Sequence, residues 1–502
     1  MARKPLIIEA PRQGTAQSQH VGFGDIRNID ISIPGVAQLN NILAKKSSKT
    51  VTAHINWIVR HPITTTEVYA LDSAGTVYKS ADSGATWAVL AGSSSTNAHG
   101  NGLLIWKNYL FVARDAYLDV CGDGSAIGII AANWTLGWKA IDSDTLWHPM
   151  LTSKNDNKLY GGAGRYVYSL DENTGQTFAP GTAGTFTWTQ QALDLPPSYR
   201  IKCIEELGNN LMLGTWQGTN VYDIRLADIF PWDRSSSSFG QPIVIDEYGV
   251  HAMKNGGNFL AVLAGTSGTV YRCDGVNAYV IGQLPIDLSG GKYLEFYPGA
   301  LVNFKNKVFF GVGTGGTWSS SNAPSPMGTY SLLQTGKGNI LNLEHLNSLL
   351  TDGSTASVKI SALLPITRDT ILSGFRSDTT YGLDLTTATS YAYGTDYSGY
   401  FESPLYQLGD DTRKDSFTTA ILQLAKPLAS GEGVKIKYRT TATGSFTTLV
   451  TFDYASYGDI SAYNLPIDFP SDIRGGMEMI QTRVELLGSS TTTPQFKFLI
   501  LT

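Results

Sequence analysis

The sequence has little charge and few residues that could bind metals or form disulfides. Only 16% of its 502 residues are charged, and the formal net charge is −5. This balance offers no basic surface to a polyanion, so we expect no sequence-specific nucleic-acid binding. The three cysteines, Cys121, Cys203 and Cys273, lie far apart without a metal-binding spacing. They are predicted to be buried free thiols outside any disulfide framework.

Long hydrophobic runs are also missing. No stretch approaches 18 successive apolar residues, so no membrane insertion is expected. The N-terminal MARKPLIIEAPRQ starts with basic residues but lacks the apolar core of a signal peptide. We therefore expect synthesis in a cytoplasm without secretion.

Motifs of common catalytic and cofactor sites are absent too. The seven histidines show no HxH or HExxH spacing, and Gly-rich turns such as GVGTGG lack the Lys-Ser ending of a phosphate-binding loop. Cys121-Gly-Asp123-Gly supplies too few ligands for a calcium loop. The sequence therefore predicts no metal, no cofactor and no enzymatic activity.

Glycine and tyrosine are abundant, with 53 and 25 residues, and they mark an internal repeat. Each copy has an apolar strand, a polar turn, a second strand ending in small residues, a Gly-rich turn, and a third strand closing on tyrosine. The closing tyrosines follow one another at 39 to 59 residues, the length of a four-stranded blade. They are Tyr78, Tyr117, Tyr168, Tyr222, Tyr271, Tyr330 and Tyr381.

Seven copies predict an all-β protein with a seven-bladed β-propeller over residues 51–394. A single antiparallel sheet cannot bury both faces, so blades stack radially, and the small residues of the second strand fit the crowded axis. Between the sixth and seventh copies, the leucines of GNILNLEHLNSLLTDG have helical spacing. We expect an inserted helix there, within an insertion near 316–356 on one propeller face.

The two ends of the chain follow other patterns. After about residue 395, the segments DSFTTAILQL, GVKIKYRTT, FTTLVTFD, MIQTRVELLG and PQFKFLILT alternate apolar with polar residues. This predicts an antiparallel β-sandwich over 395–502. Residues 1–50 are interpreted as an extended arm for neighbouring subunits, followed by a strand that turns at Pro34-Gly35. One end is expected to close the ring, because an open propeller leaves an unpaired edge.

The segment SADSGATW, residues 80–87, resembles the Asp box of sialidases and other β-propeller proteins. Such a box fixes a hairpin at the outer part of a blade and carries no chemistry. A sialidase-like hydrolase also needs an arginine cluster, a tyrosine activated by a glutamate, and an acid aspartate. The nearest match to the family's arginine motif is Tyr199-Arg200-Ile201-Lys202, with lysine in place of proline. We predict a structural hairpin held by Ser80, Asp82, Gly84, Thr86 and Trp87.

Two further resemblances point to tailed bacteriophages. The run YFESPLYQLGDDTRKDSFTTAILQLAKPLASGEGVKIKYRTTATGSFTTLVTF resembles a β-sandwich module of phage virion proteins. RNIDISIPGVAQL and VYALDSAGTVYKSADSGATW are similar to propeller-bearing tail proteins of these viruses. The resemblance implies a structural tail subunit of the nozzle, hub or tip. Such a subunit would form a ring with its own copies, contact other tail proteins, and contribute to DNA-channel closure or host attachment.

Two alternatives remain open at this point. The first is a receptor-binding tail protein whose exposed aromatic side chains stack on host glycans. The second is a glycoside hydrolase related to sialidases. Candidate glycan or partner contacts are Trp216, Trp232 and Trp318.

Overall fold

The structure, a computed structural model, is all-β and divides into two units. Residues 44–327 and 351–385 form the propeller unit, and residues 1–43, 328–350 and 386–502 form the terminal unit. This division differs from the expected boundaries, since the terminal unit combines three segments of the chain. The structure describes residues 6–9, 26–33, 35–41, 43–45, 51–93, 99–142, 147–216, 227–284, 286, 288, 292–316, 328–335, 338–346, 358–377, 380–386, 391, 399–408, 417–459, 461–466, 478–489 and 491–502.

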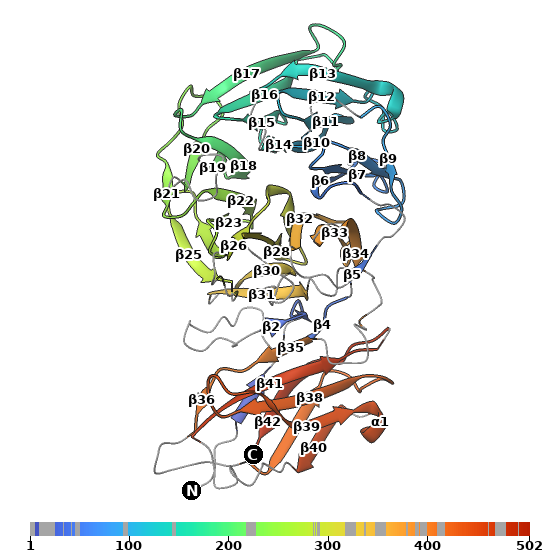
Figure 1. The fold of residues 1–502 in the computed structure, drawn as a ribbon, viewed down its shortest axis with the longest axis vertical. Coiled ribbons are helices and arrows are strands. Elements are labelled where there is room, and N and C mark those ends of the chain that lie inside the picture. The colour runs from blue at the N-terminus through green and yellow to red at the C-terminus, as the bar shows by residue number, and fades with distance from the viewer. Residues whose placement is uncertain are drawn as a thin grey trace. The chain divides into compact units, whose positions relative to one another are not determined.

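The propeller unit contains antiparallel sheets of four strands that pair in chain order. Figure 1 shows them from blue to yellow-green along the chain. The five sheets are β6 (Ile55–Arg60), β7 (Val68–Asp72), β8 (Val77–Ser80), β9 (Ala88–Val89); β10 (Gly102–Trp106), β11 (Tyr109–Ala113), β12 (Tyr117–Cys121), β13 (Trp134–Ala140); β14 (Met150–Thr152), β15 (Leu159–Ala163), β16 (Tyr166–Glu172), β17 (Phe186–Asp194); β18 (Arg200–Leu207), β19 (Asn210–Trp216), β20 (Ala227–Trp232), β21 (Ile243–Ile245); and β22 (Val250–Asn255), β23 (Leu260–Ala264), β24 (Thr269–Cys273), β25 (Ala278–Gln283).

The first strands of these sheets contact one another in a closed cycle. Strands β6, β10, β14, β18 and β22 follow in order, β22 contacts β27 (Leu301–Phe304), β27 contacts β32 (Val358–Pro365), and β32 contacts β6. First strands around a common axis are the arrangement of a β-propeller. The all-β propeller fold is therefore confirmed. A count of seven complete blades stays a prediction, because only five copies are described as separate four-stranded sheets.

The cycle is completed by strands from distant parts of the chain. One sheet has the order β26-β29-β32-β33-β34-β5, so β5 from the N-terminal segment lies beside β34. The expected closing strand is thus supplied by the N-terminal segment. The remaining elements of the unit are β5 (Leu43–Lys45), β26 (Lys292–Glu295), β28 (Lys307–Gly311), β29 (Gly313–Gly316), β33 (Ile371–Ser377), β34 (Thr380–Thr386), η1 (Ala131–Asn133) and η2 (Pro298–Ala300).

Glycines in the second strands let neighbouring sheets approach closely, as the repeat predicted. A Cβ on Gly162 would lie 2.7 Å from Ile201 Cγ2 of the next sheet. A Cβ on Gly214 would lie 2.7 Å from Val250 Cγ1, again in the next sheet. Real Cβ atoms do not approach other atoms this closely, so a larger side chain would push the sheets apart.

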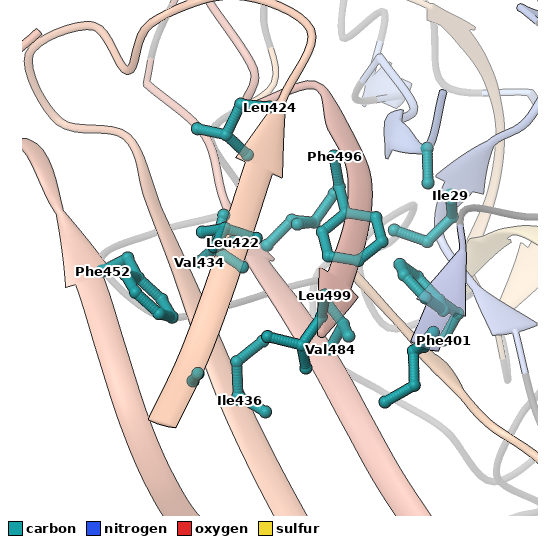
Figure 2. Close-up of a cluster of buried hydrophobic side chains, with 14 of the residues drawn as sticks. Ile29, Phe401, Leu422, Leu424, Val434, Ile436, Phe452, Val484, Phe496 and Leu499 are labelled. Atoms are coloured by element: carbon teal, nitrogen blue, oxygen red, sulfur yellow. The ribbon is translucent and has the colours of Figure 1, made fainter. Parts of the chain in front are cut away.

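The terminal unit has two sheets around one core. One sheet has the order β1-β42-β37-β40, and the other runs β30-β31-β2-β35-β41-β38-β39, with β36 also paired to β41. Figure 2 shows leucines of β37 and β42 beside Val434, Ile436 and Val484 of the second sheet. The described strands and α-helix of this unit are β1 (Leu6–Glu9), β2 (Ile26–Arg27), β3 (Ile29–Asp30), β4 (Gln38–Leu39), β30 (Gly328–Thr335), β31 (Gly338–Leu346), β35 (Gly399–Glu402), β36 (Tyr406–Gln407), β37 (Thr419–Leu424), β38 (Gly433–Arg439), β39 (Thr447–Asp453), β40 (Ala462–Pro466), β41 (Met479–Leu487), β42 (Phe496–Leu501) and α1 (Tyr454–Tyr457).

Two expectations about these segments are wrong. The N-terminal segment is not a free arm, because β1 pairs with β42 and Leu6 and Ile8 are buried in the terminal core. The expected inserted helix is replaced over its described part by strand β31, which pairs with β30 and β2. Strand pairing on both edges outweighs the helical spacing of the leucines, since local propensity is weaker than tertiary contacts. Within the described part of the chain, no helix could span a membrane.

Candidate binding site at the inner strands

A group of aromatic and ionisable side chains lies on the inner strands of the propeller unit. Its centre is Lys202 on β18, a buried lysine within a strand whose neighbours Ile201 and Cys203 are also buried. Burial lowers the pKa of Lys202 to about 8, although the charge of Glu295 opposes this shift. The ammonium is therefore the main form at neutral pH.

His251 on β22 is the hydrogen-bond partner of this lysine. Lys202 Nζ lies 2.8 Å from His251 Nδ1. Burial, and then the charge of Lys202, hold the pKa of His251 well below its usual value. The imidazole is thus neutral, and its Nδ1 accepts the hydrogen bond from the ammonium.

Two indole rings flank the ammonium. Lys202 Nζ lies 5.0 Å from the ring centroid of Trp216, at the end of β19, and 5.4 Å from that of Trp147. Both distances are in the range of cation–π attraction, which is stronger away from water. Gly249 leaves room for Trp216, because a Cβ at this position would lie only 2.7 Å from Trp216 Cβ. Its φ of +99° also favours glycine.

An ion pair forms the second half of the group. Lys359 on β32 donates to Glu295 Oε2 on β26 at 2.5 Å, and the Tyr297 hydroxyl donates to the same oxygen. Burial, and then Glu295, raise the pKa of Tyr297 well above its usual value. Glu295 is therefore committed to these two donors.

Trp147 connects the two halves. Its ring centroid lies 6.0 Å from that of Tyr297 and 6.4 Å from that of Trp57 on β6. His54 also packs against Tyr297, at 6.1 Å between ring centroids. Burial, followed by the charges of Lys359 and Arg376, lowers the pKa of His54 to about 4, so it is neutral at pH 7.

The chemistry of this group favours an anion as ligand. Lys202 and Lys359 supply two cations against the single carboxylate of Glu295, while both histidines are neutral. In the described part of the chain, no three His, Cys, Asp or Glu side chains form a group that could hold a metal ion. We call Lys202, His251, Trp147, Trp216, Glu295 and Lys359 the inner-strand cluster.

The residues of SADSGATW form a tightly bonded turn after β8. Asp82 Oδ1 accepts from the Thr86 amide at 2.8 Å, and Asp82 Oδ2 accepts from the Thr86 hydroxyl at 2.6 Å. Ser80 Oγ accepts from the Gly84 amide at 2.8 Å, and Trp87 Nε1 donates to the Gly84 carbonyl at 3.0 Å. Trp87 packs in a core shared with β33 and β34. These bonds fix a turn, as expected for a structural hairpin.

The tryptophans expected to contact glycans are not exposed. Trp232 is buried, donates to the Ser236 carbonyl at 2.8 Å and packs edge-on against Tyr160. Trp216 is buried beside Lys202. An exposed stacking role for these two residues is therefore wrong, because neither ring presents a free face to solvent. Trp318 lies outside the described residues.

The closing tyrosines do not all occupy one position. Tyr78, Tyr168 and Tyr271 lie in the third strands β8, β16 and β24 and are buried. Tyr117, however, begins β12 and is 39% exposed, whereas Val120 is buried opposite Phe111. The core position of the second copy thus belongs to Val120. Of the others, Tyr381 lies in β34, Tyr330 lies in β30 of the terminal unit, and Tyr222 lies outside the described residues.

The inner-strand cluster was missed at the level of sequence. One signal was available, because RIKCIEEL places an arginine, a lysine and two glutamates in one strand. Charged residues in a buried strand need local partners. No spacing, however, relates Lys202 to Trp147 or Glu295, since these residues meet only when the ring closes.

The arginine of the sialidase-like tetrapeptide has a local role. Arg200 Nη1 donates to the carbonyl oxygens of Pro197 and Tyr199, both at 2.9 Å. The three cysteines are buried and free, as expected.

Comparison with known proteins assigns no family. No family model matches the sequence, and no curated protein is similar to it. Among solved structures, the chain is similar to the extracellular domain of the hybrid two-component system BT4673 from B. thetaiotaomicron. The TM-score is 0.44 and the identity 12%, covering 81% of this chain and 44% of that one. The chain thus spans less than half of the BT4673 domain.

Two other solved structures are covered almost completely. U3-55K has a TM-score of 0.46 and 10% identity, over 69% of this chain and 98% of that one. The WD40 β-propeller domain of Doa1 has a TM-score of 0.42 and 10% identity, over 68% of this chain and 96% of that one. At these values the similarities assign no function.

Proposed function

We propose that the chain is a non-enzymatic structural subunit of a bacteriophage tail, of the nozzle, hub or tip type, located in the virion. In this role it assembles into a symmetric ring with copies of itself, contacts other tail proteins, and contributes to DNA-channel closure or host attachment. The resemblances of the C-terminal run and of the first repeat copy to tail proteins support the viral assignment. The surface of the propeller unit supports ring assembly.

Two separate apolar patches on outer strands are the observation that carries this proposal. The first lies on β21, β25 and the turn before β25, and these two strands contact each other. The second lies on η1, β13 and the turn before them. Their exposed residues are Val244 (72%), Val276 (74%), Tyr279 (53%) and Val280 (58%) in the first patch, and Ile127 (73%), Ile130 (45%) and Leu136 (45%) in the second.

Two different patches on one unit suit a head-to-tail ring. Figure 1 draws β21 and β25 on a different side of the propeller unit from β13. In a heterologous interface, one patch of each copy covers the other patch of the next copy, and rotation closes the ring. Clusters of large exposed apolar side chains mark interaction surfaces. Outer strands also offer unpaired backbone groups to a partner strand.

The proposal is tested on purified protein and on virions. We expect negative-stain images and mass photometry to show closed rings, and Val280→Glu to shift the population to monomers by burying a charge at the interface. Gln191→Glu, at an exposed polar position of β17, is the matched control and should leave the rings intact. An antibody to the chain should label phage tails. A monomer at all concentrations and unlabelled tails would exclude the proposal.

A further inference from the structure

The ammonium of Lys202 is a buried cation without a described counter-anion. Only 7% of the residue is exposed, and its one hydrogen-bond partner is a neutral imidazole. Among the described residues, no carboxylate oxygen lies within 4.0 Å of Nζ. The side chain can donate three hydrogen bonds and uses one of them on His251. Removing a charge from water without an ion pair costs free energy, so a site that retains such a charge is suited to an anionic ligand.

The nearest carboxylate is already engaged. Glu295 interacts with Lys202 only through the longer-range effect of its charge, while its Oε2 accepts from Lys359 and Tyr297. The other side chains that face Lys202 are the two indoles and His251. Among the described residues, none therefore supplies a second hydrogen-bond acceptor or a counter-charge to the ammonium.

The walls of the cluster select for a ring or another apolar body. Trp216 and Trp147 lie at similar distances from Nζ, at 5.0 and 5.4 Å. Aromatic faces give favourable contacts to flat apolar surfaces, and a few fixed polar groups orient the ligand. Lys202 and Trp216 are buried, whereas Trp147, Glu295 and Lys359 are partly exposed. Trp147 is thus the indole of the cluster that is partly exposed to solvent.

We propose that the inner-strand cluster binds a small organic carboxylate that carries a ring, with its carboxylate on the Lys202 ammonium and its ring against Trp147. The carboxylate supplies the missing counter-charge and takes the two remaining donors of the ammonium. This site is separate from the outer patches, so it goes beyond the proposed assembly role. The bond from Nζ to His251 fixes the direction of the ammonium for the ligand.

Intrinsic fluorescence gives a direct test, because Trp147 and Trp216 line the site. The full chain is titrated at pH 7 with two matched pairs of probes, benzoate with benzamide, and N-acetylneuraminate with its methyl ester. Each neutral partner keeps the ring and loses the charge. We expect at least one carboxylate to change the fluorescence saturably and to bind at least tenfold more tightly than its neutral partner, with calorimetry as the second measurement. Binding of benzoate would indicate a general ring carboxylate, and binding of N-acetylneuraminate alone would indicate an acidic sugar. The proposal would be overturned if each carboxylate bound no more tightly than its neutral partner, or if neither carboxylate bound.

Variants assign the binding to Lys202. Lys202→Met should lower the affinity for the carboxylate at least tenfold, while Lys202→Arg retains a cation and should keep measurable binding. The control is Lys79→Met, since Lys79 lies on β8 and pairs with Glu67 instead. Unchanged affinity in Lys202→Met would contradict the assignment.

The pH profile of the wild-type chain gives a test that does not depend on folding of a variant. Because the pKa of Lys202 in the free chain is about 8 and the charged form binds, affinity should fall about tenfold per pH unit above that pKa. The other groups near the ammonium are His251, Cys203, Glu295 and Lys359. His251 stays neutral in this range, while Cys203 has a pKa raised by burial. Affinity that stays constant up to pH 10.5 would argue against the ammonium as the anchor.

Discussion

The two units bury their apolar residues by opposite strategies. In the propeller unit, each of the five four-stranded sheets uses consecutive strands, so most pairing is local in the sequence. In the terminal unit, Leu6 pairs with Leu501, and Arg27 pairs with Leu343 on one side and Tyr400 on the other. Local pairing costs little loop-closure entropy, whereas pairing across hundreds of residues costs more and forms more slowly.

This difference gives the two units distinct spectroscopic signals. All ten tryptophans lie between Trp57 and Trp318, within the propeller unit. Tryptophan fluorescence therefore reports unfolding of the propeller unit, while far-UV circular dichroism reports strands of both units. Variants in one unit can be compared with variants in the other by these two signals.

The largest effect is expected from breaking a buried ion pair in the propeller unit. Arg114 Nε lies 2.6 Å from Asp119 Oδ2, and both side chains are buried. Arg114 also donates to the carbonyl oxygens of Gly75 and Ser93. Arg114→Met leaves Asp119 charged and unpaired, so the free energy of unfolding should fall by about 3 to 5 kcal/mol.

Chemical denaturation followed by tryptophan fluorescence measures this loss. Lys158→Met is the control, because the Lys158–Asp171 pair is much more exposed and should contribute at most about 1 kcal/mol. A loss below about 1 kcal/mol in Arg114→Met would show that the propeller unit does not depend on this pair.

A core deletion in the terminal unit should have the next largest effect. Leu499 of β42 is fully buried among residues of both sheets. Leu499→Ala should lower the free energy of unfolding by about 2 to 5 kcal/mol, through lost burial and the remaining cavity. The loss should appear in circular dichroism and leave the midpoint of the fluorescence transition unchanged.

The control for Leu499→Ala is Ile7→Ala on β1, since Ile7 is 48% exposed and should change stability by at most about 0.5 kcal/mol. An equal shift of the fluorescence transition in Leu499→Ala would mean that the two units unfold as one.

A smaller effect is expected at the turn formed by residues 80–87. Asp82→Ala removes the acceptors for Thr86 and should cost about 1 to 2 kcal/mol of stability. Burial raises the pKa of Asp82, but the bonds from Thr86 and Ser80 outweigh it and lower the pKa below its usual value. The stabilisation is therefore complete above the unfolded pKa near 4 and is lost as pH falls through the folded pKa.

Thermal unfolding of both proteins at pH 7 and pH 3 checks this dependence. The difference in midpoint temperature between wild type and Asp82→Ala should be smaller at pH 3 than at pH 7. Asp369→Ala, at an exposed turn position before β33, serves as the control. A gap that does not change with pH would assign the effect to packing.

At neutral pH the smallest effect is expected from His54, because its contribution appears only as the pH falls. Its pKa in the folded chain is about 4, below the value near 6.5 of an unfolded histidine. Between these values the unfolded state binds the proton more readily, so stability should fall as pH decreases from 6.5 to 4. In His54→Gln this slope of stability against pH should become shallower, as measured by fluorescence-detected denaturation at several pH values. An identical slope in the variant would assign the pH dependence to other groups.

Local pattern predicted local structure well. The five C-terminal strands that alternate apolar and polar residues are present as β37, β38, β39, β41 and β42. The small residues of the second strands do allow neighbouring sheets to approach. Both features depend on residues a few positions apart, which a sequence shows directly.

Features set by distant pairing could not be predicted. Leu343, Leu346, Leu349 and Leu350 suggested a helix, yet β2 and β30 pair with residues 338–346 and make this part a strand. Leu349 and Leu350 lie outside the described residues. The inner-strand cluster joins side chains from five strands and linkers, and no spacing in the sequence connects Lys202 with Trp147 or Lys359. The core position of the second copy was predicted at Tyr117, three residues before Val120. The sequence alone does not distinguish a tyrosine at the start of a strand from one within it.

The pairing of β1 with β42 and the place of β5 beside β34 have a consequence for biosynthesis. A ribosome adds about 5 to 20 residues per second, so β1 is made about 25 to 100 seconds before its partner strand is complete. During that time the N-terminal segment has strand-forming residues and no partner strand. A chain released before β42 is made retains this unpaired edge, which cellular proteases and chaperones recognise. Pairing of β1 thus requires that translation has passed β42.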